Sequence, residues 1–543
     1  MIDSNQFRNH NIGYLCTDLQ VELGRGGKSA FKWISESKQV QEITYAELLD
    51  ASNRAANVMA GHGLKDGDSV MLLLPRIPEL AYFFLGALKT GANCSILFTS
   101  VGDETLRDRI VETDTHMVVS HTRLVYKLER LFGESDYELK LLVVDDDMAA
   151  GGRSGIQSEW LSAGTQFVVA PTPPEKPSHF HFTSGSTGKP KAVQHVHGSA
   201  LSHISSFIEV MQPEEGDLYW CTADPGWVTG TSYGIIAPCI LGLTQVQYSG
   251  SFNSGSWMQI LEDFGVNILY SAPTVFRMMM QSEDAFYAKY DLARLKRIYC
   301  VGEPLNPIIY EWGKRVLGRE IYDTWFQTET GSIMIANRPG LEVRPGSMGK
   351  PLSSISARIL DEKGEPVADQ QKGLLCLKKP WPSMFTGYMN HPEVYAAKFM
   401  GEYYSSGDIA HKDADGYFWF IGRNDDVINT GGHLVSPFEV ESALLEIPEV
   451  ADGGVVGVPD ELLYEKVVAF VILRNGAELT PALDLKIKLY ISKKVSSIAS
   501  PREIAVVASI PKTKSGKIMR RLLKSRYLGL ESGDTSTLEN ENE

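Results

Sequence analysis

Helical and strand-like patterns alternate over the first third of the chain. Thr44 and Glu47 form a capping box that predicts a helix running through Met59, and Gly61 and Gly63 stop it. Apolar runs of strand length follow at 69–74, 117–119 and 141–144, and a second helical pattern lies at 78–89. Such alternation is typical of α/β layers with a substantial parallel sheet.

At 543 residues the chain is too long for one hydrophobic core, so at least two domains are expected. A stiff proline-rich connector occupies 171–174, just before the most informative loop. A second boundary is predicted near Arg423, and the region after it has roughly the length of one domain. The predicted division is therefore 1–423 and 424–543.

Composition narrows the function classes. A formal net charge of −15 disfavours nucleic acid or an anionic membrane as partner. The longest apolar runs are far too short to cross a bilayer, and the polar N-terminus lacks the order of a signal peptide, so a cytoplasmic enzyme is expected. Six cysteines without paired spacing favour reduced core thiols over a disulfide framework or zinc site.

The segment 183–191 combines small, hydroxyl and basic residues in the order TSGSTGKPK. Glycines let backbone amides close around phosphate oxygens, hydroxyls donate hydrogen bonds, and lysines neutralise charge. Pro190 after the lysine, and the absence of glycine at position 183, argue against a Walker loop. On composition alone, an ordinary surface turn is about equally probable.

These residues resemble the signature loop of the adenylate-forming superfamily, with Ala192 where glycine is usual. Further segments are similar, in order, to those of the short bacterial acetyl-CoA synthetases: 223–230, 301–307, 323–331, 407–408, 422–426 and 511–521. The resemblance covers essentially the whole chain. It implies an α/β fold, with a large N-terminal domain of layered α/β subdomains and a small mobile C-terminal α+β domain.

The resemblance implies ATP, Mg²⁺ and coenzyme A as cofactors and a short carboxylic acid as substrate. It places the triphosphate and the nucleotide at one set of residues: Thr183, Ser184, Gly185, Ser186, Thr187, Gly188, Lys191, Gly302, Glu303, Pro304, Asp323, Thr324, Trp325, Gln327, Thr328, Asp408 and Arg423. Asp408 would accept both ribose hydroxyls. Trp325 is equally compatible with a core position.

Three residues are assigned to catalysis by the same resemblance: Lys517, Glu329 and Thr187. Glu329 would hold Mg²⁺ against the phosphates, and Lys517 would stabilise charge at the bridging oxygen between acid and α-phosphate. Asp425 matches the hinge about which the C-terminal domain swings, and Gly432 lies where the coenzyme A arm would approach.

The acyl pocket implied by the resemblance consists of Val228, Thr229, Val301 and Phe326. Acetate-specific relatives commonly carry tryptophan at position 326, and relatives using longer acids carry glycine. Phenylalanine is still a large block, so acids of two to four carbons are predicted, with graded discrimination between chain lengths.

The segment Gly431-Gly432-His433-Leu434 departs from the pattern, which has arginine at position 434, and the next residues resemble aryl-CoA ligases. Three alternatives therefore stay open: a ligase for a longer or aromatic acid, an acyl-adenylate former with another acceptor, and a catalytically silent nucleotide-binding protein. The last is disfavoured by the presence together of Lys517, Glu329, Asp408 and Arg423. The sequence leaves the oligomeric state open, and structural roles are expected for His195 and His197.

Overall fold

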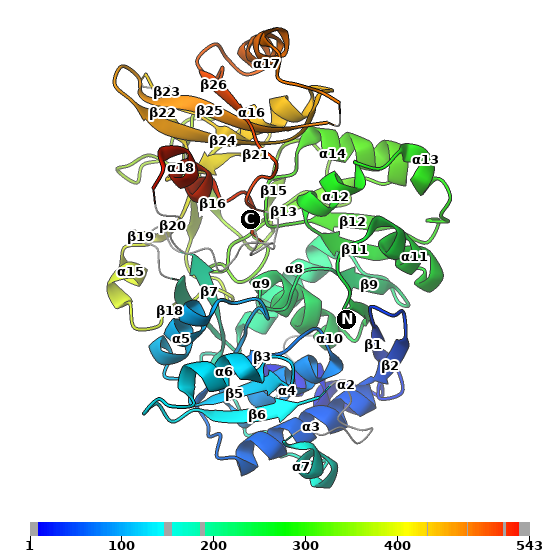
Figure 1. The fold of residues 1–543 in the computed structure, drawn as a ribbon. Coiled ribbons are helices and arrows are strands. Elements are labelled where there is room, and N and C mark those ends of the chain that lie inside the picture. Colours follow the sequence, from blue (N-terminus) through cyan, green and yellow to red (C-terminus); the bar gives the residue numbers. More distant parts are fainter. Residues whose placement is uncertain are drawn as a thin grey trace.

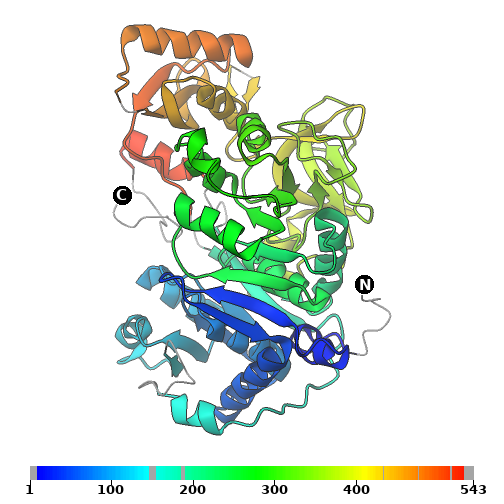
Figure 2. The same cartoon turned by 90° about the vertical axis from the view of Figure 1, so that its right-hand side faces the viewer.

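A computed structural model describes residues 9–145, 155–184, 190–431, 433–474, 476–513 and 517–530. Two large sheets with their helices form the lower and middle parts of the molecule in Figure 1, and a separate layer of C-terminal elements lies above them. Figure 2 shows the same C-terminal layer from the side, with α17 across its top. This is the predicted α/β class with a small C-terminal α+β domain.

The first large sheet has seven strands and is parallel through its middle. In spatial order its strands are β18 (Gly387–Tyr388), β8 (Pro190–Val196), β7 (Pro177–Ser184), β4 (Asn93–Ile96), β3 (Ser69–Leu73), β5 (Met117–His121) and β6 (Lys140–Val144). The predicted strands at 69–74, 117–119 and 141–144 are β3, β5 and β6, so these predictions are confirmed.

The second large sheet has nine strands, of which β13, β12, β11, β9, β10 and β1 run parallel as neighbours. In spatial order its strands are β15 (Lys350–Pro351), β14 (Ile335–Ala336), β13 (Ile321–Trp325), β12 (Arg297–Cys300), β11 (Ile268–Ser271), β9 (Leu218–Cys221), β10 (Thr244–Tyr248), β1 (Ser29–Ile34) and β2 (Val40–Thr44).

Two five-stranded sheets complete the molecule, one before and one after residue 424. The first, antiparallel, contains β16 (Ala357–Leu360), β17 (Gly373–Lys378), β19 (Phe399–Met400), β20 (Tyr403–Lys412) and β21 (Phe418–Arg423). The second contains β22 (Ile428–Thr430), β23 (His433–Val435), β24 (Val450–Asp460), β25 (Tyr464–Leu473) and β26 (Glu503–Val506).

The helices cover these sheets. Those of the larger part are α1 (Ile12–Cys16), α2 (Asp18–Glu22), α3 (Tyr45–Gly61), α4 (Pro78–Thr90), α5 (Asp103–Glu112), α6 (Val125–Phe132), α7 (Gln157–Ser162), α8 (Ser199–Met211), α9 (Val228–Thr231), the π-helical turn η2 (Ser232–Ile236), α10 (Ala237–Leu241), α11 (Ser254–Phe264), α12 (Pro273–Met279), α13 (Asp284–Tyr287), α14 (Pro307–Trp312), the π-helical turn η3 (Gly313–Leu317) and α15 (Pro392–Ala396). The C-terminal sheet carries α16 (Pro437–Leu445), α17 (Pro481–Lys494) and α18 (Arg520–Leu528).

Local sequence signals account for the first long helix. Thr44 caps α3 by accepting a hydrogen bond from the Glu47 amide, and the Glu47 carboxylate accepts one from the Thr44 amide. This is the predicted capping box, and the helix extends to Gly61, two residues beyond the predicted end at Met59. The second predicted helix is α4, which ends before Gly91 in the left-handed conformation.

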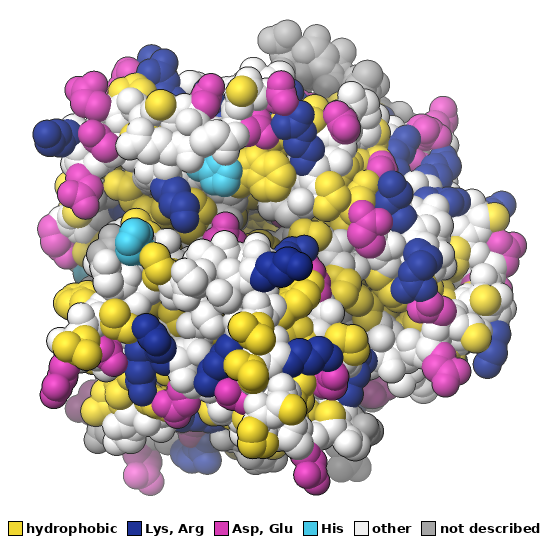
Figure 3. All heavy atoms as spheres, turned by 90° about the horizontal axis from the view of Figure 1, so that it is seen from above, with side chains coloured by type: hydrophobic (Ala, Val, Ile, Leu, Met, Phe, Trp, Pro, Cys, Tyr) yellow, Lys and Arg dark blue, Asp and Glu magenta, His cyan; other side chains and the backbone are white. Residues whose placement is uncertain are grey.

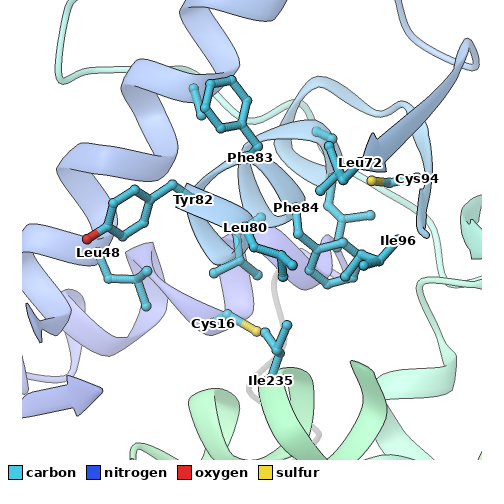
Figure 4. Packing of buried hydrophobic residues seen from close by; sticks show 14 of the residues in the cluster. Cys16, Leu48, Leu72, Leu80, Tyr82, Phe83, Phe84, Cys94, Ile96 and Ile235 are labelled. Atoms are coloured by element: carbon cyan, nitrogen blue, oxygen red, sulfur yellow. The ribbon is translucent and has the colours of Figure 1, made fainter. Parts of the chain in front are cut away.

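The largest core cluster lies between the seven-stranded sheet and helices α1, α3 and α4. Figure 4 shows how Tyr82, Phe83 and Phe84 of α4 project in different directions, so that this helix is buried on nearly all sides. Cys16 and Ile235 come close in the same cluster and join the first helix to η2. All six cysteines are buried and free, which confirms the prediction of core thiols.

The surface charges and the lengths of the apolar helices agree with what the composition predicts. On the face seen from above, acidic and basic side chains alternate and lie among hydrophobic ones (Figure 3). Across the part of the chain that the structure describes, no helix is both long and apolar enough to cross a bilayer.

Candidate functional site

The predicted site residues gather at the carboxyl ends of neighbouring parallel strands. Strands β9, β11, β12 and β13 lie side by side, as Figure 1 shows, and the loops that leave them begin at residues 222, 272, 301 and 326. Ligands of open α/β sheets bind at this edge, because the connecting loops there converge on one crevice. The candidate residues for adenine binding, acyl binding and catalysis therefore follow one another along this edge of the sheet.

The predicted phosphate loop connects two long antiparallel strands of the seven-stranded sheet. Thr183 near the end of β7 lies opposite Lys191 near the start of β8, so the hairpin holds both residues at the base of the loop. The other loop candidates, Gly185, Ser186, Thr187 and Gly188, lie outside the described residues, as does the Ser184 side chain.

Asp408 is the centre of a buried polar network. Its Oδ1 accepts a hydrogen bond from Arg423 Nη1 at 3.2 Å, because the two residues are paired across strands β20 and β21. Its Oδ2 accepts from Trp325 Nε1 at 3.0 Å and from Gln327 Nε2 at 3.1 Å. Burial raises the pKa of Asp408, while Arg423 and Trp325 act in the opposite direction. The network brings four predicted nucleotide residues together, and Trp325 both bonds Asp408 and packs against a core cluster.

Lys517 lies within electrostatic range of this network. Its side chain keeps contact with solvent, yet the surrounding protein lowers its pKa, first by desolvation and then by repulsion from Arg423. Asp426 and Asp408 act in the opposite direction. An exposed lysine that interacts with one arginine and two aspartates is available to meet an incoming anion.

Glu329 is fixed by a residue that the sequence analysis missed. Tyr388 of β18 donates a hydrogen bond to Glu329 Oε1 at 2.8 Å, and the Phe385 amide bonds the Glu329 carbonyl at 3.0 Å. Glu329 lies in a turn, not at the start of a helix, and is half-buried with Thr328 beside it. Tyr404, also missed, donates to Gln327 Oε1 at 2.9 Å. A lone tyrosine carries no sequence signal for such a role.

The predicted adenine slot contains two carboxylates with different surroundings. Burial raises the pKa of Asp323 to about 7, and the Leu305 amide and the Cys300 thiol both point at its carboxylate. Glu303 Oε1 instead accepts a hydrogen bond from the Thr274 amide at 2.7 Å, and its Oε2 accepts one from Arg277 at 2.5 Å. Both Glu303 oxygens are therefore already bonded inside the protein.

The other residues of the predicted adenine slot would contribute mainly backbone atoms to it. Gly302 has φ of 95°, a conformation that a side chain would strain, and Pro304 follows in the same loop. The Thr324 hydroxyl donates to the Cys300 carbonyl at 2.8 Å inside the sheet. If a purine binds as predicted, the loop backbone after β12 and the end of β13 would line its face.

Two of the four acyl-pocket candidates lie at one hydrophobic cluster. Val301 is a buried member of it, and Phe326 packs against it. The Phe326 ring lies edge-on to Tyr233 of η2, with centroids 5.5 Å apart. Val228 and Thr229 form the start of α9, which runs directly into η2. The contact between Phe326 and Tyr233 thus joins the loop after β13 to η2, the direct continuation of α9.

Tyr233 is a third residue that the sequence analysis missed. Its hydroxyl accepts a hydrogen bond from the Ile333 amide at 2.7 Å and contacts Ser206 Oγ at the same distance. Both contacts are buried, so the ring has one well-defined position behind Phe326.

The predicted hinge and coenzyme A segments follow β21. Asp425 is exposed, and its carboxylate lies 3.6 Å from Arg423 Nε. Gly432 lies outside the described residues, while Gly431 before it has φ of 56°. Leu434 of β23 is exposed. Buried positions are observed for His195 and His197.

Comparison with known proteins places this site in a family. The model of the AMP-binding enzyme family matches residues 20–389, and the model of the AMP-binding enzyme C-terminal domain matches 439–517. The chain is 42% identical to the acetyl-coenzyme A synthetase of Bacillus subtilis (strain 168), over 97% of this chain and 92% of that protein.

Solved structures agree with this match. An acyl-CoA synthetase of Brucella canis is 33% identical with a TM-score of 0.73, covering 96% of this chain and 94% of that one. The anthranilate CoA ligase AuaEII, in complex with anthranoyl-AMP, is 27% identical with a TM-score of 0.88, covering 98% and 99%. The chain therefore belongs to the AMP-binding enzyme family and is an AMP-forming acid–thiol ligase of the acetyl-CoA synthetase type.

Proposed function

We propose that this enzyme uses ATP to join a carboxylic acid of two to four carbons to coenzyme A. The observation that carries the chain length is Phe326, which ends the candidate pocket and is backed by the fixed ring of Tyr233. The acetyl-coenzyme A synthetase names of several relatives support a small acid as well.

In the first half-reaction, the acid's carboxylate attacks the α-phosphate of ATP, giving acyl-AMP and pyrophosphate. Two anions have to approach each other, so positioning and charge neutralisation contribute most of the catalysis. Lys517 would neutralise the charge that develops at the bridging oxygen. Asp408, with Arg423 and Trp325 behind it, would hold the ribose.

The surroundings of Glu329 fit Mg²⁺. This ion is commonly held by one or two carboxylates together with substrate phosphates, not by an all-protein cage. Glu329 is one such carboxylate, with one oxygen bonded to Tyr388, and across the described residues no group of three or more His, Cys, Asp or Glu is poised to hold a metal. When bound, the ion would neutralise phosphate charge.

In the second half-reaction, the coenzyme A thiol attacks the acyl carbonyl and AMP leaves. We propose that residues 1–423 and 424–543 act as two domains, and that Asp425 is the hinge between two orientations of the smaller one. One orientation brings Lys517 to the nucleotide, and the other brings the glycines near Gly432 to the acyl group, where a missing side chain admits the thiol arm.

A panel of acids tests the proposal. Pyrophosphate release would be measured with Mg-ATP and acetate, propionate, butyrate, hexanoate or benzoate, each with and without coenzyme A. Turnover that peaks at two to four carbons and needs coenzyme A is expected. A peak at hexanoate or benzoate would contradict the assignment of Phe326 as the pocket's end.

An aromatic acid is the second candidate. The anthranilate CoA ligase AuaEII has a similar fold over nearly the whole chain, and Leu434 departs from the acetate pattern. Benzoate turnover above acetate would favour this candidate. A single burst of pyrophosphate without thioester would instead indicate another acyl acceptor.

A further inference from the structure

Two buried ion pairs meet where the C-terminal layer rests on the larger part of the molecule. Arg277 of α12 donates to Glu303 at 2.5 Å, and their side chains are 15% and 8% exposed. From the C-terminal layer, Arg520 at the start of α18 donates to Glu441 of α16 at 2.6 and 3.2 Å, with exposures of 16% and 8%. Helix α14, which contacts α12, also contacts α16, as the views in Figures 1 and 2 agree.

The charges of the two pairs act on each other across this contact. Burial opposes the charge of Arg277, but Glu303, Asp452 and Glu441 raise its pKa, and the last two belong to the C-terminal layer. Burial likewise opposes the charge of Arg520, whose pKa is raised by Glu441, Asp426 and, from the larger part, Glu303. The positive and negative groups therefore alternate across the interface.

Such an arrangement specifies orientation more than it adds stability. Each buried pair loses water, and the opposite pair repays part of that desolvation only when the two parts are in register. A displaced domain would leave like charges facing each other or return both pairs to water. The contact is therefore selective for one orientation and still weak enough to separate.

The interface lies between two assigned functional segments. Glu303 belongs to the loop of the adenine slot, and Arg520 follows Lys517 by three positions. The Arg277 side chain bonds Glu303 and the Thr274 hydroxyl, so α12 supports that loop from behind. None of the family motifs quoted in the sequence analysis contains Arg277 or Glu441.

We propose that Arg277 and Glu441 are positioning residues that hold the C-terminal region where Lys517 reaches the nucleotide. They then serve acyl-AMP formation and have no part in thioester formation, for which that region has to leave. This inference rests on the two-step function proposed above.

The half-reactions separate this role from a general structural one. In the full-length enzyme, Arg277→Met is expected to slow acid-dependent pyrophosphate–ATP exchange at least tenfold. Its rate of thioester formation from supplied acyl-AMP and coenzyme A should stay within about twofold of the original enzyme. Lys486→Ala is the control, since it removes an ion pair with Glu449 at 2.7 Å away from this interface and should change neither rate. Equal loss in both half-reactions, or loss in neither, would overturn the proposal.

A double-mutant cycle tests the coupling across the interface. Glu441→Gln should also slow exchange, and the Arg277→Met/Glu441→Gln double variant should be no slower than the worse single one. Multiplying effects would show that the residues act independently and would refute the shared role.

Amide hydrogen exchange gives a readout that needs no reaction. Arg277→Met should accelerate exchange in α14 and α16, which face each other, with α3 as an internal reference. Unchanged protection of α14 and α16 would overturn the interface role. If the original enzyme releases pyrophosphate with none of the acids, the proposed function fails, and this measurement still decides whether the charges hold the interface.

Discussion

The two sides of the proposed active site are built on different physical principles. On the nucleotide side, Asp408, Arg423, Trp325 and Gln327 come from β13 and the loop after it and from strands β20 and β21, and bond one another in a buried network. On the C-terminal side, Lys517 stands on a short connection whose backbone bonds Thr513, and its side chain remains in contact with solvent.

The difference indicates a division of labour. A network whose partners are already bonded binds its ligand with little reorganisation and serves every step in which the nucleotide is present. A lysine delivered by a separate layer can be present for one step and absent for the next. Substitutions on the first side should therefore affect both half-reactions, and those on the second side only one.

The largest effect is expected for Lys517→Ala. Removing the charge that meets the bridging oxygen should slow pyrophosphate–ATP exchange by about 10³-fold, at the upper end for a single electrostatic group. Conversion of supplied acyl-AMP to thioester should continue. Lys524→Ala, which removes a pair with Glu465 at 2.9 Å, is a matched control. Exchange that survives in the Lys517 variant would break the comparison outright.

The rate of pyrophosphate–ATP exchange should also depend on pH through Lys517. Because its pKa is lowered, the charged form present at low pH is lost at a lower pH than for an ordinary lysine. Exchange should therefore decline on the alkaline side, and Lys517→Arg should shift that decline upward, because guanidinium stays protonated. A decline at the same pH in both variants would assign it to another group.

The next effect is expected for Asp408→Ala. This change leaves Arg423 without its carboxylate and removes the acceptor for Trp325 and Gln327. Both half-reactions should slow by about 10²-fold, or about 2.7 kcal/mol, somewhat less than the 3–5 kcal/mol that breaking a buried pair costs in stability. Asp408→Asn, which keeps acceptors for Trp325 and Gln327, should lose less. A loss confined to exchange would place Asp408 on the Lys517 side of the comparison.

The sequence predicts residues in short motifs better than residues that act through distant contacts. The β20–β21 pairing that joins Asp408 to Arg423 lies within motifs of recognisable spacing, and the capping box of α3 is encoded over four residues. Tyr388, Tyr233 and Arg277 act through contacts with residues 59, 93 and 26 positions away. Nothing near them in sequence signals those partners, because tertiary packing alone brings them together.

An effect on stability, with no loss of rate implied, is expected for Asp323→Asn. The folded protein retains the Asp323 proton up to about pH 7, whereas an unfolded aspartate loses it near pH 4. Between these values the folded state binds more protons, so the unfolding free energy falls as pH rises, by at most about 4 kcal/mol. Asparagine stays neutral and avoids that loss.

Thermal unfolding at pH 5 and pH 8 measures this. The Tm of Asp323→Asn relative to the original enzyme should be higher at pH 8 than at pH 5. Asp263→Asn, at an exposed position on α11, provides the reference for a pH effect without burial. An identical Tm difference at both pH values would mean that Asp323 is already ionised in the folded state.

The smallest effect concerns chain length and belongs wholly to the nucleotide side. Phe326→Gly should raise kcat/KM for hexanoate relative to acetate by about tenfold, since each methylene at a pocket edge discriminates by about 1–3 kcal/mol. The gain should stop there, because Tyr233 lies 5.5 Å behind the removed ring and its hydroxyl is bonded to Ile333 and Ser206.

Two further variants decide whether Tyr233 is the second wall. Phe326→Gly/Tyr233→Ala should extend the range to longer acids than Phe326→Gly alone, and Phe326→Trp should narrow it toward acetate. All three should change exchange and thioester formation in parallel, because the acyl group occupies the pocket in both steps. A chain-length shift in only one half-reaction would mean that the C-terminal layer, and not Phe326, closes the pocket in that step.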